Sequence, residues 1–192
     1  MTNKKFNWKK ELISWAVMIA VFGTLYLTGL HTPVIGKIQS LLLSTHLITP
    51  DLDQKEAVTF NFNGILKSSD GTVINSEELS DKTIFINYWA TWCPPCLGEL
   101  PHINKLYQQV KSDPNVVFLL ISKDQDFNKA IRFMDKKEYD LPIYTEVKGF
   151  DKLSSRVLPS SYVIKNGEIV FETEGMSNFN TQEFKDFLIS RY

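Results

Sequence analysis

The sequence contains very few cysteine and histidine residues. Its 192 residues include two cysteines and three histidines. Two cysteines are too few for the disulfide framework that stabilises small secreted domains. A structural zinc site needs four ligands, and only one histidine, His102, follows residue 46. The composition therefore argues against both a disulfide-rich scaffold and a zinc domain, and we predict no metal site.

The chain also lacks a strong charge of either sign. Its 21 basic and 22 acidic residues give a net charge of −1, and no block of like charges occurs beyond the N-terminal lysines. A basic surface for nucleic acid is not expected, so we predict no nucleic-acid partner. Internal repeats and low-complexity tracts are missing too. The hydrophobic content of 43% is enough for a sizeable core, which argues against disorder.

One long segment near the N-terminus lacks charged side chains altogether. Residues 12–30 read LISWAVMIAVFGTLYLTGL and follow a lysine-rich stretch. As a helix this segment would span about 28 Å, close to the hydrocarbon thickness of a bilayer. Trp8, Trp15 and Tyr26 lie near its ends, where aromatic rings favour the membrane interface. We therefore predict a single transmembrane anchor over residues 12–30.

The lysines that precede this segment predict its orientation. Residues 1–11 would form a cytoplasmic tail, and everything after the anchor would be exported. A cleavable signal peptide is the main alternative, but its apolar core is about 7–15 residues long and ends at a small-x-small site. The exit LTGLHTPVIG offers no such site. A buried helix of a soluble domain is a second alternative, against which the lysine flank argues.

The exported part divides into a linker and a folded domain. Residues 31–56 carry a roughly helical stripe of apolar residues, which predicts a linker helix that lies on the membrane surface or packs on the following domain. Residues 57–192 alternate between strand and helix patterns. Strand–helix–strand order predicts an α/β domain with a mixed central sheet, parallel in its middle and antiparallel in a closing hairpin that turns at Asn166–Gly167.

The individual elements follow from local patterns. VTFNFNGIL, residues 58–66, alternates apolar and polar residues as one half-buried strand does, and further strands are expected in TVIN, TIFINYWA, NVVFLLIS and LPIYTEV. Helices are expected from Cys93 to about Val110, after an N-cap at Asp126, and at the C-terminus after Asn180 or Thr181.

Both cysteines lie in one short motif, WCPPC, between a predicted strand and a predicted helix. A disulfide used only as a staple would close too short a loop to remove much entropy from the unfolded chain. At the start of a helix, however, unpaired N–H groups favour the thiolate of Cys93 and lower its pKa. Cys96, one turn further along, suits the resolving role. Pro94 and Pro95 fit the first helical turn and would modulate the pair by stiffening the loop.

The stretch NYWATWCPPCLGELP, residues 87–101, resembles the active-site segment of thioredoxin-fold proteins, and most of all the membrane-anchored TlpA/ResA-type thiol–disulfide oxidoreductases. The resemblance covers about residues 57–192. It implies a thioredoxin-like fold with an N-terminal β extension and no cofactor. It also implies that Cys93 and Cys96 are catalytic, that they form a redox-active disulfide, and that Trp92 contacts the substrate.

The same family has a cis-proline that faces the disulfide. Pro159, in VLPSSYVI, is the matching residue, and the Leu158 backbone would pair with a substrate chain. Asn87 stands where thioredoxin has a buried acidic residue, and Glu99 matches a glutamate of the TlpA/ResA type, for which we expect a modulating role or that of a solvated helix carboxylate. Ser160 departs from the glutamate of the specialised cytochrome c maturation members.

The resemblance implies a membrane-tethered enzyme that reduces disulfides in exported proteins, with apocytochrome c as one target in cytochrome c biogenesis. Its electrons would come from a membrane thiol carrier, and its domain would lie in the periplasm, outside the inner membrane of a bacterium. Two alternatives stay open: a disulfide-forming oxidant of the same fold, and a module that holds copper(I) between two thiolates. A peroxidase of this fold is disfavoured, because it would need Thr and Arg around a single cysteine.

Overall fold

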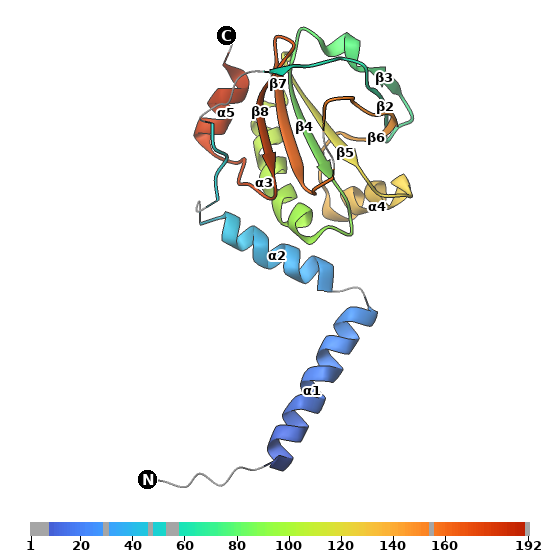
Figure 1. The fold of residues 1–192 in the computed structure, drawn as a ribbon, viewed down its shortest axis with the longest axis vertical. Coiled ribbons are helices and arrows are strands. Elements are labelled where there is room, and N and C mark those ends of the chain that lie inside the picture. The colour runs from blue at the N-terminus through green and yellow to red at the C-terminus, as the bar shows by residue number, and fades with distance from the viewer. Residues whose placement is uncertain (1–7, 29–30, 46–47, 53–57, 154–155, 191–192) are drawn as a thin grey trace.

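The computed structural model describes residues 8–28, 31–45, 48–52, 58–153 and 156–190. Two helices, α1 (Trp8–Leu27) and α2 (His31–Leu43), precede an α/β domain, and α1 projects away from that domain with α2 between them (Figure 1). No residue of α1 is buried, and the helix is long and apolar enough to cross a membrane. It begins and ends a few residues before the predicted span of 12–30. The predicted tail, residues 1–11, lies mostly outside the described residues.

A mixed sheet organises the domain. Within the described ranges it has eight strands in the order β1-β8-β7-β4-β5-β6-β2-β3. The pair β4 (Thr83–Trp89) and β5 (Val116–Ser122) is parallel, and β7 (Ser160–Lys165) runs antiparallel on the other side of β4. All of β4 after Thr83 is buried, as expected of a central strand covered on both faces. The remaining strands are β1 (Val58–Thr59), β2 (Ile65–Ser68), β3 (Val73–Asn75), β6 (Ile143–Lys148) and β8 (Glu168–Glu174).

The prediction of a single strand over residues 58–66 is wrong. Val58 and Thr59 pair with β8, whereas β2 pairs with β6 near the opposite edge of the sheet. Between these strands the chain crosses one face of the sheet, where the rings of Phe60, Phe62 and Phe150 pack together. A Cβ on Gly64 would lie only 2.4 Å from the Phe150 ring, so glycine permits this crossing. Contacts between aromatic rings, rather than strand pairing, bury Phe60 and partly cover Phe62.

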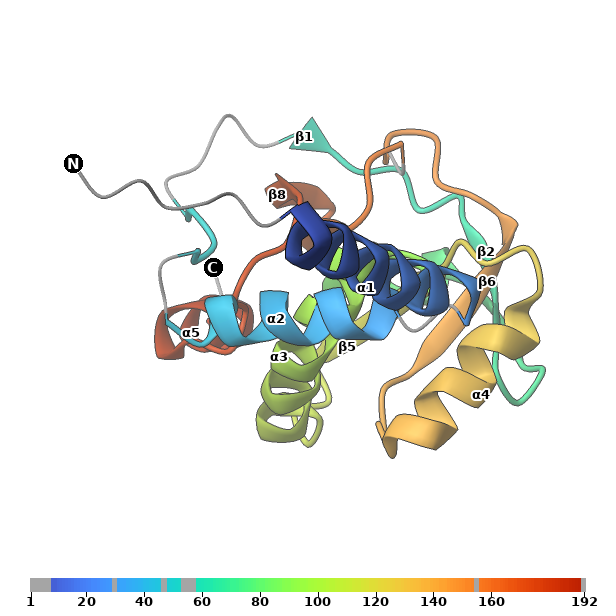
Figure 2. The same ribbon diagram turned by 90° about the horizontal axis from the view of Figure 1, so that it is seen from below.

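Three helices cover the opposite face of the sheet (Figure 2). They are α3 (Pro94–Val110), α4 (Phe127–Lys137) and α5 (Gln182–Ile189), and a short 3-10 helix spans Ser76–Leu79. The predicted N-caps Asp126 and Thr181 are confirmed, since each side chain accepts a backbone N–H of its helix. The predicted thioredoxin-like architecture is confirmed, with β1, β2 and β3 as its N-terminal β extension.

The helix α2 packs directly on α3. Gly36 and Gly98 meet at the crossing, where a Cβ on Gly98 would lie 2.9 Å from the Gln39 Cβ and 3.0 Å from the Gly36 carbonyl oxygen. Leu43 is fully buried, and the Asn178 side chain donates a 3.0 Å hydrogen bond to its carbonyl. The helical part of the predicted linker therefore rests on the domain. The predicted boundary at residues 56 and 57 lies outside the described residues.

Candidate active site

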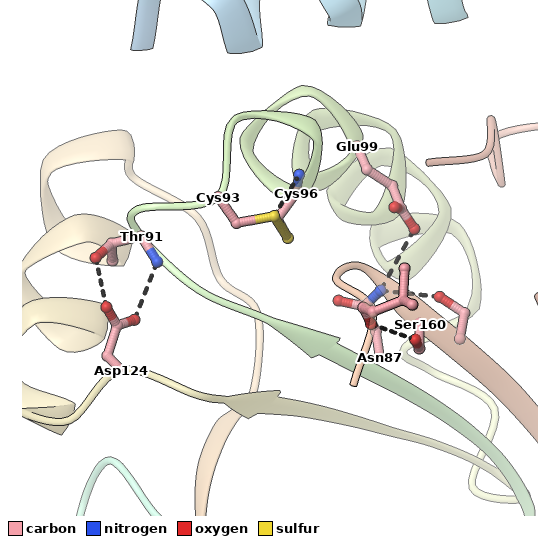
Figure 3. Close-up of a disulfide and its surroundings, with 9 residues drawn as sticks. Asn87, Thr91, Cys93, Cys96, Glu99, Asp124 and Ser160 are labelled. Carbon is pink, nitrogen blue, oxygen red and sulfur yellow. Dashed lines mark hydrogen bonds between the residues drawn. A yellow bond between two sulfur atoms is a disulfide. The ribbon is translucent and has the colours of Figure 1, made fainter. Parts of the chain in front are cut away.

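Cys93 and Cys96 form a disulfide where β4 gives way to α3 (Figure 3). The S–S distance is 2.07 Å and the Cα–Cα distance is 5.3 Å. Cys93 is the N-cap of α3, and its Sγ accepts a hydrogen bond from the Cys96 backbone N–H at 3.3 Å. Pro94 and Pro95 occupy the first turn of α3. Backbone N–H groups in a first turn have no partner within the helix, so the missing N–H of proline costs no hydrogen bond there. The first sulfur therefore sits where the N-terminus of a helix stabilises a thiolate.

An exposed aromatic residue directly precedes the disulfide. Cys93 is only 4% exposed, whereas the neighbouring Trp92 is 60% exposed. Val157, two residues before Pro159, is also exposed. An aromatic ring that stays in water next to a covered sulfur is suited to contact an incoming peptide. The contact of Trp92 with a substrate stays a prediction.

The peptide bond between Leu158 and Pro159 is cis, as the sequence predicted. Pro159 directly precedes β7, and the first residue of that strand, Ser160, pairs with Tyr88 near the end of β4. The proline loop and the cysteine loop therefore lie at the same end of the central strands β4 and β7. The Pro159 carbonyl accepts a 2.9 Å hydrogen bond from Gly175 N–H, which fastens this loop to the chain after β8.

A buried polar group lies beneath the cysteine loop. The Asn87 side chain donates to the Ser161 hydroxyl at 2.9 Å and to Glu99 Oε1 at 3.4 Å (Figure 3). Glu99 is completely buried, and among the described residues its Oε2 has no hydrogen-bond partner. Burial raises the pKa of Glu99 well above its ordinary value, and Ser161 and the Ser177 backbone counter this rise only in part. The expectation of a solvated carboxylate is wrong, because α3 directs Glu99 into the core.

Sequence reasoning missed Asp124, which anchors the loop before the disulfide. Its carboxylate accepts the Thr91 backbone N–H at 3.0 Å and the Thr91 hydroxyl at 2.6 Å (Figure 3). The Ser122 hydroxyl donates to the same carboxylate at 2.9 Å. Because β4 and β5 are parallel, the residues that follow them meet at one edge of the sheet. An acidic residue two positions after the predicted strand NVVFLLIS was the available signal.

We expect Asp124→Ala to destabilise the oxidised protein by about 2 kcal/mol, because it removes charge-assisted hydrogen bonds and leaves the half-buried Thr91 N–H unpaired. Urea unfolding of the full-length chain measures the effect. Thr91→Val, which removes the hydroxyl alone, should account for about 1 kcal/mol of it. Gln125, the exposed residue next to Asp124, is the matched control, and Gln125→Ala should change the stability little. Equal stabilities for Asp124→Ala and Gln125→Ala would show that the loop needs no such anchor.

Other polar residues near the site have structural partners. His102 lies at the contact between α2 and α3, with its Nε2 atom 3.2 Å from the Ser40 carbonyl oxygen. Within the described part of the chain, no cluster of three or more His, Cys, Asp or Glu side chains could hold a metal ion.

The chain is similar to known proteins over most of the α/β domain. Residues 52–155 match the family model described as Redoxin. The thiol-disulfide oxidoreductase ResA of Halalkalibacterium halodurans is 33% identical over 131 residues, which are 66% of this chain and 73% of that protein. The ResA of Oceanobacillus iheyensis is 31% identical over 118 residues, 59% of this chain and 60% of its own.

Solved structures share the fold. StoA from Bacillus subtilis superposes with a TM-score of 0.51 at 21% identity, covering 64% of this chain and 93% of StoA. A putative thiol:disulfide interchange protein DsbE from Chlorobium tepidum gives a TM-score of 0.54 at 18% identity, covering 70% of this chain and 92% of its own. At these identities the two structures speak for the fold alone.

Proposed function

The chain belongs to the redoxin family as a thiol–disulfide oxidoreductase of the ResA type, and we propose that it reduces disulfides in exported proteins while tethered to a membrane. One observation carries the catalytic part of this proposal. Cys93 Sγ accepts an N–H at the start of α3, beside an exposed Trp92 and the loop of cis-Pro159. This arrangement suits an attacking thiolate that a partner chain can reach.

The proposed reaction transfers two electrons to the partner. The Cys93 thiolate attacks one sulfur of the partner's disulfide, so that a mixed disulfide forms and the partner's other sulfur leaves as a thiolate and takes up a proton. Cys96 Sγ then attacks Cys93 Sγ and releases the second partner sulfur, which becomes a thiol. The product on this chain is the Cys93–Cys96 disulfide, the oxidised state that the structure contains. A membrane thiol carrier would return the two electrons.

Substrate binding follows from the surface around the pair. Trp92 offers an exposed ring, and the backbone of Leu158, just before the cis bond, is proposed to pair with an extended partner chain. We propose apocytochrome c as a specific target, on the strength of the family resemblance. Ser160 offers no charge to such a target, since it is fully buried and donates to the Val157 carbonyl.

The tether is proposed from α1. This helix is long and apolar enough to cross a membrane, and the lysines before it and in its first turn favour a cytoplasmic N-terminus. In this arrangement residues 1–11 form the cytoplasmic tail, 12–30 the anchor, 31–56 the linker and 57–192 the periplasmic thioredoxin-like domain. Retention of the chain in membranes after alkaline washing, without cleavage near residue 30, tests the anchor against a signal peptide.

The direction of electron flow has a direct test. We expect a reduction potential near that of thioredoxin, about −270 mV, rather than that of the oxidant DsbA, about −120 mV. Equilibration of the full-length protein with thiol–disulfide buffers of known potential, followed by alkylation of free thiols, gives the value. A potential close to that of DsbA would assign the protein to disulfide formation instead of disulfide reduction.

A further inference from the structure

The helix α2 has two different faces. One face carries Gly36, Ser40 and Leu43 and packs on α3 and the C-terminal part of the domain. The other face is solvent-exposed in the described structure although it is aliphatic, and Leu41 is 71% exposed. The exposed aliphatic residues of α2 are Val34, Ile35, Ile38, Leu41 and Leu42.

The spacing of these residues makes a continuous stripe. At about 100° per residue, the five exposed aliphatic side chains fall within an arc of roughly 120°, and the centre of that arc is opposite Gly36 and Leu43. No charged residue lies inside the arc, and Lys37 stands at its edge. A surface helix of a soluble protein normally turns polar residues outward. The exposed aliphatic stripe of α2 is therefore expected to contact an apolar environment outside the domain.

The position of α2 along the chain identifies that environment. Only three residues separate Leu27, the last residue of α1, from His31, the first residue of α2. Even fully extended, this connection spans at most about 14 Å. The headgroup layer on each side of a bilayer is roughly 5–8 Å thick. If α1 crosses the membrane, α2 begins inside that layer or just beyond it.

We propose that α2 is an interfacial helix, with its aliphatic stripe in the headgroup region of the bilayer and its opposite face clamped to the active-site helix. The proposal rests on the membrane anchor of the proposed function and goes beyond it. Aliphatic side chains on one face with a lysine at the edge are the composition of a helix that lies in the membrane interface. The occupant of this surface is thus lipid.

This placement also positions the active site. A Cβ on Gly36 would lie 2.9 Å from the Leu97 Cβ and 3.2 Å from the Pro94 carbonyl oxygen, so α2 lies against the first turn of α3. That turn contains Cys96, and Cys93 caps it. An α2 held in the interface therefore holds the CPPC loop close to the membrane surface, where it meets partner disulfides that are themselves near the bilayer.

Photocrosslinking of the full-length protein tests the proposal. The photoreactive residue p-benzoylphenylalanine replaces Ile38 or Leu41 in protein reconstituted into nanodiscs of phosphatidylethanolamine and phosphatidylglycerol. Val73 is an exposed aliphatic residue on β3, the last strand in the sheet order, which lies away from α2 (Figure 1), and it is the matched negative control. Ile19 in α1 is the positive control. Mass spectrometry identifies the adducts, and insulin reduction verifies that each variant is folded.

We expect lipid adducts at positions 38, 41 and 19 and none at 73. Adducts at 19 without adducts at 38 and 41 would overturn the interfacial helix and leave the anchor intact. Crosslinks from 38 or 41 to a second copy of the chain would overturn it as well, in favour of a dimer interface. A lack of lipid adducts at position 19 would contradict the anchor of the proposed function, and the interfacial helix with it.

Discussion

Replacing Cys93 with serine is expected to abolish disulfide reduction, whereas replacing Cys96 with serine is expected to leave the protein trapped on its partner as a mixed disulfide. The two sulfurs are not equivalent in the structure. Cys93 caps α3 and receives the Cys96 N–H, while Cys96 lies within the first turn and is almost completely buried. Removal of a covalent nucleophile lowers the rate by on the order of 10³-fold or more, so Cys93→Ser should fall to the uncatalysed rate of thiol exchange.

Insulin reduction measures the loss of activity, and non-reducing electrophoresis of membranes from cells that express each variant measures the trapping. The double variant, Cys93→Ser with Cys96→Ser, is the control for nonspecific complexes and should trap nothing. Mass spectrometry of the trapped species names the partner and the linked sulfur. Complexes formed by Cys93→Ser and not by Cys96→Ser would reverse the roles of nucleophile and resolving cysteine.

Replacing Glu99 with glutamine is expected to make the oxidised protein more stable at alkaline pH, with little change at acidic pH. Burial raises the folded-state pKa of Glu99 well above the ordinary value of 4.5. The folded chain therefore holds this proton more tightly than the unfolded chain does. The resulting stabilisation is fully present below the unfolded-chain pKa and is lost as pH rises through the folded-state pKa, by up to about 1.4 kcal/mol per pH unit. Glutamine is neutral throughout and shows no such loss.

Urea unfolding of both proteins from about pH 4 to about pH 9 gives the comparison. At the alkaline end we expect Glu99→Gln to be about 1–3 kcal/mol more stable, because burial of a charged carboxylate without a cationic partner is more unfavourable than burial of an amide. The same change at the exposed Glu172 is the control and should shift neither curve. Parallel curves for wild type and Glu99→Gln would mean that Glu99 ionises normally in the folded protein.

The modulating role of Glu99 has a separate readout. In the reduced protein, the pH dependence of alkylation reports the thiol pKa values of Cys93 and Cys96. If Glu99 influences the pair, Glu99→Gln should shift one of these values and the rate of insulin reduction. Unchanged thiol pKa values and an unchanged rate would restrict Glu99 to a role in the core.

Features encoded by neighbouring residues were predictable from the sequence. WCPPC combines a strand end, two prolines suited to a first helical turn and two thiols at a fixed spacing, so the disulfide and its place at the start of α3 could be inferred. The cis bond before Pro159 was predictable from the resemblance of the short motif VLPSSYVI to the family. Asp126 and Thr181 were recognisable because an N-cap bonds within its own helix.

Features that depend on distant residues were not predictable. The surroundings of Glu99 come from Asn87 on β4 and Ser161 on β7, which the sheet brings together. The sequence alone left open whether this carboxyl modulates the cysteine pair or lies in solvent. Asp124 meets Thr91 across 33 residues of sequence. The break in residues 58–66 depends on Phe150, because a ring from far along the chain takes the place of a strand partner.

Under the proposed membrane anchor, the crossing of Gly36 and Gly98 would limit how the catalytic loop approaches a partner. A domain joined to its membrane anchor by a long flexible linker diffuses through a large volume, and its active site faces every direction in turn. Here three residues join α1 to α2, and α2 is in backbone contact with the helix that begins at the disulfide. With α1 in a bilayer, diffusion of the catalytic loop is confined to a thin layer parallel to that surface. In that arrangement, the height of a partner's disulfide above the membrane would select the partner before any side chain is recognised.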